Sequence, residues 1–200
     1  MRHNIFPVFS SPIFASHVKV EDSVIEELNK EKHIKINLEE YAGSTSEDKF
    51  LLRKEKYSKL KKDIMNVLEY YNDTYLKFKT DFQMTTSWLA KTFPNTSSAL
   101  HNHTNAFLSG VLYLRVPNNS GDIMFENMNV HNVQIETTED TLYNSNRFFF
   151  NPAPGVIIFF PSNVYHKVLE NNSNDERLSL AFNFMPCGNT GHEDSQFNYK

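Results

Sequence analysis

The segment His101-Asn102-His103 leads into the strand-like run Ser109-Gly-Val-Leu-Tyr-Leu-Arg-Val116. Residues i and i+2 of an extended segment point to the same side, so both imidazoles can reach one point. A third histidine, His166, follows a later apolar run, and Arg177 comes eleven residues after it. This arrangement predicts a metal ion on one side of a β-rich scaffold and an anchor for an acidic molecule on the other.

Short apolar runs continue along the chain on both sides of this segment. The breaks between them, such as Pro117–Gly121 and Asn151–Gly155, are rich in residues that favour turns. The runs predict strands at Ala99–His103, Phe107–Val116, Asp122–Glu126, Val130–Thr138, Arg147–Asn151, Val156–Phe160, His166–Leu169 and Arg177–Phe184. Strands that succeed one another without intervening helices predict an antiparallel sandwich or barrel, with the earlier helices packed outside.

The first part of the chain predicts supporting elements. Residues 5–20 should be extended, a short helix should begin at Glu21, and residues 34–46 should form a loop. Ser46 is predicted to cap a long helix, because acidic residues follow it in what would be the first turn. The buried face of this helix is predicted by apolar residues at spacings of three and four: Tyr57, Leu60, Ile64, Val67 or Leu68, and Tyr71.

The periodicity changes after Asp73, and the loose alternation of Phe82, Met84, Thr86 and Trp88 predicts a strand over Phe78–Trp88. We therefore expect a single domain over residues 1–200, mainly β with flanking helices. Its parts would be a supporting segment at 1–75, a β core at 76–186 and a loosely ordered polar tail at 187–200.

Composition and charge exclude several classes of protein. Hydrophobic residues make up 40% of the 200 residues, 17 of them phenylalanine, which predicts a packed core. The net charge of −4 lacks the basic excess of a nucleic-acid-binding protein. A single cysteine leaves no disulfide framework. No stretch predicts a membrane span or a signal peptide, so we expect a cytoplasmic protein, which could form a homodimer.

The candidate site residues allow more than one chemistry. Neutral imidazole binds iron, zinc, copper and nickel alike, so the ligand type does not select the metal. A guanidinium inside a barrel needs an anionic partner. For Arg177 this partner could be Glu170 or Glu176, or the carboxylate of a bound ligand, which the planar fork of arginine fits.

Taken together, several motifs resemble the 2-oxoglutarate- and Fe(II)-dependent dioxygenases, and more narrowly the prolyl-hydroxylase-like oxygenases of bacteria and phages. The motifs are His101-x-His103, Ser109–Leu114, Gly121–Phe125, Gly155–Ser162, His166 and Arg177–Asn183. The resemblance covers about residues 80–186 in consistent order. It implies a double-stranded β-helix (jelly-roll, cupin-like) core, with Fe(II) as cofactor and 2-oxoglutarate as co-substrate. It also implies hydroxylation of an unidentified protein or small-molecule substrate, with release of succinate and CO2.

The same resemblance implies roles for individual residues. His101 corresponds to the first iron-binding histidine and His166 to the distal one. Arg177 corresponds to the residue that forms a salt bridge with the far carboxylate of 2-oxoglutarate, and Tyr113 lies where many members hydrogen-bond that carboxylate. No catalytic residue is expected beyond the metal ligands.

One position departs from the pattern, because the superfamily has an acidic residue where this chain has His103. Three ligand sets follow. His103 could be the third ligand, a carboxylate such as Asp122 could complete the site from a neighbouring strand, or His103 and Asn105 could form the motif with His101 outside it. An all-histidine face fits the spacing without moving a strand.

Two other classes of function stay open from the sequence. One is a cupin-like metalloprotein that binds zinc, nickel or copper without 2-oxoglutarate. The other is a non-catalytic jelly-roll binding or structural module, which would bind no metal.

Overall fold

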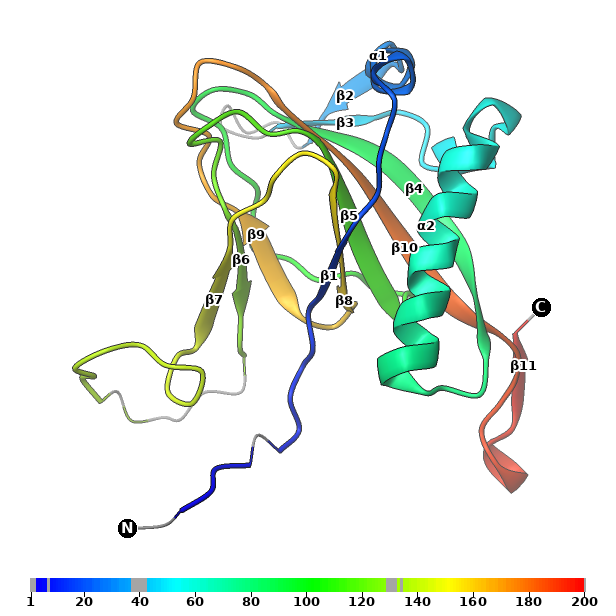
Figure 1. The fold of residues 1–200 in the computed structure, drawn as a ribbon, viewed down its shortest axis with the longest axis vertical. Helices are drawn as coiled ribbons and strands as arrows, with labels where there is room; N and C mark the ends of the chain where they lie inside the picture. Colours follow the sequence, from blue (N-terminus) through cyan, green and yellow to red (C-terminus); the bar gives the residue numbers. More distant parts are fainter. Residues whose placement is uncertain (1–2, 7, 37–42, 129–132, 134, 200) are drawn as a thin grey trace.

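The computed structural model describes residues 3–6, 8–36, 43–128, 133 and 135–199 of the chain (Figure 1). Two α-helices are described, α1 (Asp22–Asn29) and α2 (Ser58–Tyr71). The strands are β1 (Phe14–His17), β2 (His33–Lys35), β3 (Ser44–Ser46), β4 (Asp81–Thr92), β5 (Leu108–Arg115), β6 (Ile123–Glu126), β7 (Arg147–Phe150), β8 (Val156–Pro161), β9 (Tyr165–Val168), β10 (Arg177–Thr190) and β11 (Phe197–Tyr199). Short helical turns lie at Leu51–Arg53, Glu55–Tyr57, Asn72–Leu76 and Glu193–Ser195.

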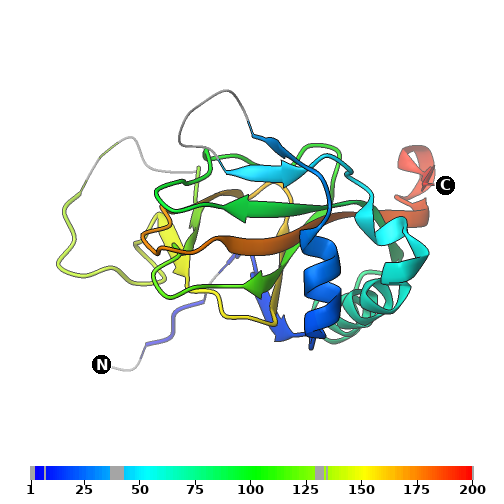
Figure 2. The ribbon, with the colours of Figure 1, turned by 90° about the horizontal axis from the view of Figure 1, so that it is seen from above.

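The strands form two antiparallel sheets. The larger sheet has the order β1-β8-β5-β10-β4-β3-β2, with β11 paired to the end of β10, and the smaller sheet has the order β7-β6-β9. Figure 1 shows the smaller sheet facing one side of the larger one, while α2 lies along the other side. Figure 2 shows α1 and α2 together at that outer side.

Two apolar clusters hold these layers together. The outer cluster joins the helices to the larger sheet, and in it the Phe14 ring stacks on Tyr71 with centroids 4.4 Å apart. The inner cluster consists of Tyr113, Ile123, Phe125, Ile158 and Phe160. Because β5 and β8 contribute to both clusters, both of their faces are buried, which explains their nearly continuous apolar sequences.

The predicted fold class is confirmed: the protein is mainly β with flanking helices, and its core is a double-stranded β-helix. The predicted buried face of the long helix is also confirmed. Its apolar residues are all buried: Tyr57, Leu60, Ile64, Leu68 and Tyr71. The short helix predicted from Glu21 is α1.

The predicted start of the long helix is wrong. Ser46 ends β3 instead of capping a helix, and its buried hydroxyl accepts a hydrogen bond from Leu89 N (3.0 Å) and donates one to Asp48 O (2.7 Å). Two short helical turns follow, and the extended backbone of Lys54 separates them. The helix proper therefore begins at Ser58.

Three other expectations need correction. Ala99–His103 is not a strand, apart from one isolated bridge at His101. The loop expected at 34–46 includes the end of β2 and all of β3, and its residues 37–42 lie outside the described residues. The strand expected at Val130–Thr138 is absent from the described part of that range, 133 and 135–138.

The C-terminal tail also differs from the expectation. β10 continues to Thr190, and β11 folds back to pair with Gly188–Thr190. Backbone hydrogen bonds hold this hairpin, and they require no apolar side chains, so the polar composition of the segment gave no sign of it.

The alternation predicted in the strand before Trp88 is interrupted. β4 pairs with β10 through Asn183 and Thr86, and then through Phe184 and Met84, which leaves Thr85 as an extra residue. Such a bulge changes the face to which the following side chains point. Phe82 and Met84 accordingly pack in the outer cluster, whereas the Trp88 ring contacts His103 on the inner side.

Within the described residues, no helix combines the length and the apolar character needed to cross a membrane.

We predict that Leu68→Ala lowers the free energy of unfolding by about 2–4 kcal/mol, because Leu68 is buried between α2 and the larger sheet and its truncation leaves a cavity. Urea denaturation followed by circular dichroism measures the change. Asn66→Ala, at an exposed position of the same helix, is the control and should change stability by less than about 0.5 kcal/mol. Equal effects of the two substitutions would contradict the packing described.

Candidate metal centre and anion anchor

Two of the three predicted metal ligands are joined through their backbones. His101 N donates to His166 O (3.0 Å), and His166 N donates to His101 O (2.8 Å). His166 lies on β9 of the smaller sheet, opposite Phe125. His103 N in turn donates to Ser162 O (3.0 Å), directly after β8 of the larger sheet. The segment that carries His101 and His103 therefore bridges the two sheets.

The three imidazoles converge. One ligand atom from each of His101, His103 and His166 lies within 4.8 Å of the others. The Nε2 atoms of His103 and His166 are 3.3 Å apart. Two nitrogens that bind one ion at roughly 2.1 Å, at angles between octahedral and tetrahedral, would be separated by roughly 3.0–3.4 Å. The cluster thus fits a single metal ion.

Hydrogen bonds to the backbone orient two of the rings. Nδ1 of His101 lies 2.9 Å from Ala99 O, and Nδ1 of His166 lies 3.0 Å from Val164 O. Since a carbonyl can only accept, both Nδ1 atoms carry the proton, and the Nε2 lone pairs remain available to a metal.

The surroundings keep His103 and His166 neutral. Burial lowers the pKa of His103 to about 4 and that of His166 to about 3, and the neighbouring His101 adds to both shifts. Aromatic rings form much of the enclosure: Phe160 lies 4.8 Å and Phe125 6.0 Å from the His166 ring, and Trp88 lies 5.6 Å from the His103 ring. A neutral imidazole is the form that binds a metal, so no proton must be displaced near pH 7.

Arg177, the first residue of β10, is a buried cation that forms no ion pair with a described residue. Its side chain is 1% exposed. Nη1 donates to Gly121 O (2.5 Å), and the guanidinium carbon lies 5.0 Å from the centre of the Tyr113 ring. Nε makes no hydrogen bond with any described residue. Burial lowers the pKa of Arg177, while Tyr113 and the carboxylate of Asp122 oppose the shift. A buried guanidinium in this state calls for an anionic ligand.

Tyr113 adds a neutral donor beside this cation. Its side chain is fully buried, and its hydroxyl lacks a hydrogen-bond partner within the described structure. Burial raises the pKa of Tyr113, so the phenol keeps its proton. Tyr113 and Arg177 together offer the donors that a carboxylate accepts.

The structure does not place the carboxylates considered as partners of Arg177, or as an alternative metal ligand, in those roles. Glu176 pairs with Lys91 (3.5 Å) and Arg115 (3.7 Å), and Glu170 is exposed, so neither neutralises Arg177. Asp122 is not in the histidine group; its Oδ1 accepts a hydrogen bond from Asn151 Nδ2 (2.6 Å).

Asn105, the other residue considered as a ligand, is exposed in a turn with φ of 54°. The three histidines are the group that the fold brings together.

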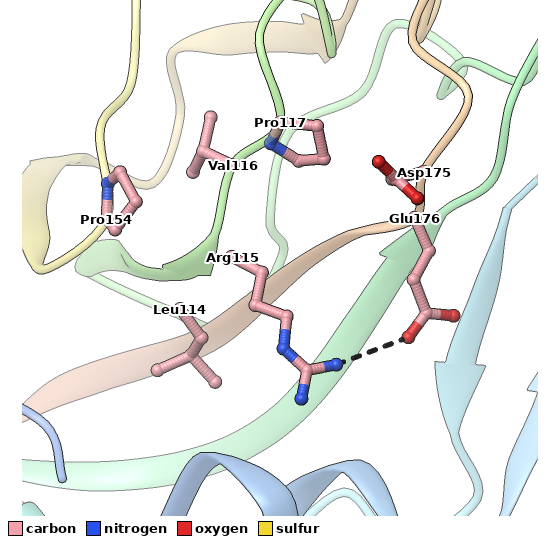
Figure 3. A pocket seen from close by; sticks show the side chains of 7 residues that line it. All are labelled: Leu114, Arg115, Val116, Pro117, Pro154, Asp175 and Glu176. Atoms are coloured by element: carbon pink, nitrogen blue, oxygen red, sulfur yellow. Dashed lines mark ion pairs between the residues drawn. The ribbon is translucent and has the colours of Figure 1, made fainter. Parts of the chain in front are cut away.

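A surface pocket of about 460 Å³ lies elsewhere on the larger sheet. Leu114–Pro117, Pro154, Asp175 and Glu176 line it, and Figure 3 shows the ion pair between Arg115 and Glu176 across it. None of the three histidines lines this pocket. Arg115 is also neutralised by Glu26, so the pocket lacks a free charge to attract an anion.

Several residues around the centre are not predicted from the sequence. The pattern places Trp88 and Thr86 only in a strand, and no motif connects the carbonyl of Gly121 with Arg177. Gly121 has φ of 86°, and a Cβ there would lie 2.3 Å from Leu169 O. A glycine directly before a predicted strand was the available signal for such a tight backbone approach.

Residues 86–183 match the model of a family described as putative 2OG-Fe(II) oxygenase. This match confirms the resemblance predicted from the motifs. No curated protein sequence matches the chain.

Solved structures of similar fold include several 2-oxoglutarate-dependent proteins. The non-heme alpha ketoglutarate dependent epimerase SnoN from nogalamycin biosynthesis has a TM-score of 0.66 at 12% identity, covering 89% of this chain and 80% of that protein. HygX from Streptomyces hygroscopicus, solved with nickel and 2-oxoglutarate, has a TM-score of 0.64 at 10% identity, covering 88% and 83%. A prolyl-4-hydroxylase from Pseudomonas putida has a TM-score of 0.58 at 15% identity, covering 87% and 93%. At these identities the likeness shows the fold.

The lowered histidine pKa values predict how the stability of the metal-free protein depends on pH. Histidine in the unfolded chain has a pKa of about 6.5, above the values of about 4 and 3 in the folded protein. As the pH falls below about 6.5, the unfolded state takes up protons first, so the folded state loses stability; above about pH 7 both states are neutral.

Chelator-treated wild type should therefore lose more stability between pH 7 and pH 5 than His103→Asn, by at most about 1.4 kcal/mol per pH unit. Urea denaturation at several pH values measures this difference. Parallel profiles of the two proteins would contradict the burial of His103.

Proposed function

Residues 86–183 of this chain belong to the 2OG-Fe(II) oxygenase family, and from that premise we propose that the protein is a hydroxylase. Fe(II) and 2-oxoglutarate are the cofactors of this family, and the oxygenase would use them to oxidise an organic substrate. One observation carries the proposal for this chain: a metal-sized cluster of three imidazoles and a buried guanidinium without a carboxylate partner among the described residues lie on the same jelly-roll core.

His101, His103 and His166 would hold the iron. When bound, Fe(II) and 2-oxoglutarate activate O2, so that one oxygen atom enters a C–H bond of the substrate and the other enters succinate as CO2 is released. The three histidines orient the ion, and the aromatic rings of Phe125, Phe160 and Trp88 limit the access of water.

Arg177 and Tyr113 would bind the far carboxylate of 2-oxoglutarate. Arg177 supplies a positive charge. The Tyr113 hydroxyl, which burial keeps protonated, donates a hydrogen bond. The carbonyl of Gly121 holds one arm of the guanidinium, which fixes its direction before the co-substrate arrives. This preorganisation reduces the entropy lost on binding.

Arg177→Ala should raise the dissociation constant of 2-oxoglutarate at least tenfold, because a charge-assisted contact in a buried site is lost. Calorimetric titration of 2-oxoglutarate into the zinc-loaded protein measures it, and metal analysis should show an unchanged zinc content. Arg115→Ala, at the surface pocket, is the matched control and should bind like wild type. Unchanged affinity in Arg177→Ala would contradict the role of Arg177, and no binding of 2-oxoglutarate to the zinc-loaded wild type would favour a metalloprotein that does not use it.

His103→Ala should lower metal affinity at least tenfold, whereas His103→Asp should retain metal, because a carboxylate replaces the imidazole as a ligand. Metal content after dialysis against Fe(II) or Zn(II), read by atomic emission, separates these variants. Asp122→Asn is the control for the alternative ligand set. Loss of metal in Asp122→Asn, with retention in His103→Ala, would assign the third ligand to Asp122.

A further inference from the structure

A row of hydrogen-bonded polar side chains crosses the larger sheet near the histidine cluster. The backbones of Thr86 on β4, Asn183 on β10 and Ser109 on β5 lie opposite one another, and Ser162 follows the end of β8. Their side chains are joined in sequence: Ser162 Oγ to Ser109 Oγ (2.8 Å), Ser109 Oγ to Asn183 Oδ1 (2.7 Å) and Asn183 Nδ2 to Thr86 Oγ1 (3.1 Å).

The row lies on the same side of the sheet as the proposed site. Side chains two residues apart on a strand share a face, so Asn183 shares a face with Arg177, and Ser109 with Tyr113. Along the strands, Arg177 and Tyr113 lie towards one end and the row lies towards the other. Ser162 is directly linked to the cluster, because its carbonyl accepts the hydrogen bond from His103 N.

The hydrogen bonds of the row have a defined direction. The Oδ1 atom of Asn183 can only accept, so Ser109 donates to it. Ser109 has a single hydroxyl proton, and Ser162 must therefore donate to Ser109. At the other end Asn183 Nδ2 donates to Thr86, whose own hydroxyl proton is not used. Thr86 donates no hydrogen bond to any residue that the structure describes.

The end of the row thus presents donors. Thr86 and Asn183 are half-buried, and each has an N–H or O–H left over. Trp88, two residues along β4, is half-buried, contacts the His103 ring and has an indole N–H with no acceptor in the described part of the chain. Unpaired donors beside an aromatic face suit a ligand that carries an oxygen acceptor next to an apolar group.

We propose that the Thr86 end of this row is a substrate subsite, which binds a carbonyl or carboxylate oxygen of the substrate while Trp88 covers its apolar part. This inference rests on the proposed oxygenase function, because only an enzyme has a substrate. The hydrogen-bond donors are side chains of this protein and are present whether or not that function is correct. The subsite favours acceptors, because a group that can only donate could use the second lone pair of Thr86 Oγ1 but would leave the Thr86 hydroxyl proton and the Trp88 indole N–H unpaired.

Trp88 is the single tryptophan of the chain, so its indole N–H gives one resolved signal in a protein labelled with ¹⁵N-tryptophan. The probes are benzamide, which carries a carbonyl acceptor, and benzylamine, which has the same ring and only donors. Each is titrated into the protein with Zn(II) and 2-oxoglutarate, and again into the metal-free protein. We expect a saturable shift of the Trp88 signal with benzamide and a weaker response, by about fivefold or more, with benzylamine.

Thr86→Val removes the hydroxyl while keeping the branched shape, and it should weaken benzamide binding about five- to tenfold. Thr86→Ser should bind like wild type. Thr85→Val is the matched control, because the Thr85 hydroxyl already donates to Asn183 O (3.2 Å) and offers nothing to a ligand. Benzamide binding that is absent, equalled by benzylamine or unaffected by Thr86→Val would overturn the subsite, as would an equal loss in Thr85→Val.

The two proposals fail in different ways. If Zn(II) or 2-oxoglutarate does not bind, the oxygenase proposal fails, while Thr86-dependent benzamide binding to the metal-free protein still supports an acceptor subsite. If both cofactors bind and benzamide does not, the subsite is wrong and the oxygenase proposal stands.

Discussion

The paired backbone hydrogen bonds between His101 and His166 are the interaction on which the centre depends. They join a loop before β5 to β9 of the smaller sheet, and they set two imidazoles side by side with ring centres 4.4 Å apart. The bond from His103 N to Ser162 O ties the same loop to the larger sheet. The histidine cluster is thus held by main-chain contacts between the two sheets. Side-chain packing around it then determines the protonation state of the rings.

The sequence predicted the strand runs, the buried stripe of α2, and the residues that converge at the centre. These features depend on local periodicity or on motifs that lie close together. The errors concern contacts between distant residues. Ser46 looked like a helix cap because its partner, Leu89, lies 43 residues away on β4. The subsite residues Thr86 and Asn183 could not be paired without the register between β4 and β10, and the bulge at Thr85 alters that register.

An all-imidazole cluster has electrostatic consequences. Neutral histidines leave a bound Fe(II) with its full double charge, whereas a carboxylate ligand would reduce it by one. Arg177 adds a further buried positive charge on the same core. A dianion such as 2-oxoglutarate would offset most of this charge, so binding of the metal and binding of the co-substrate should strengthen each other in a medium of low dielectric constant. As a proposed ligand, His103 would therefore affect the strength of this coupling as well as the coordination of the ion.

The bulge at Thr85 also separates two packing environments within strand β4. The Asp81–Met84 part of β4 is constrained by the outer core and by the neighbouring end of β10, where the C-terminal hairpin begins. The part from Thr86 to Thr92 is constrained by the interior of the jelly roll. Since the extra residue changes the face to which the following side chains point, Phe82 and Met84 face the outer core whereas Trp88 faces the centre. The C-terminal hairpin and the interior side chains near the histidine cluster thus belong to opposite ends of β4, with the bulge between them.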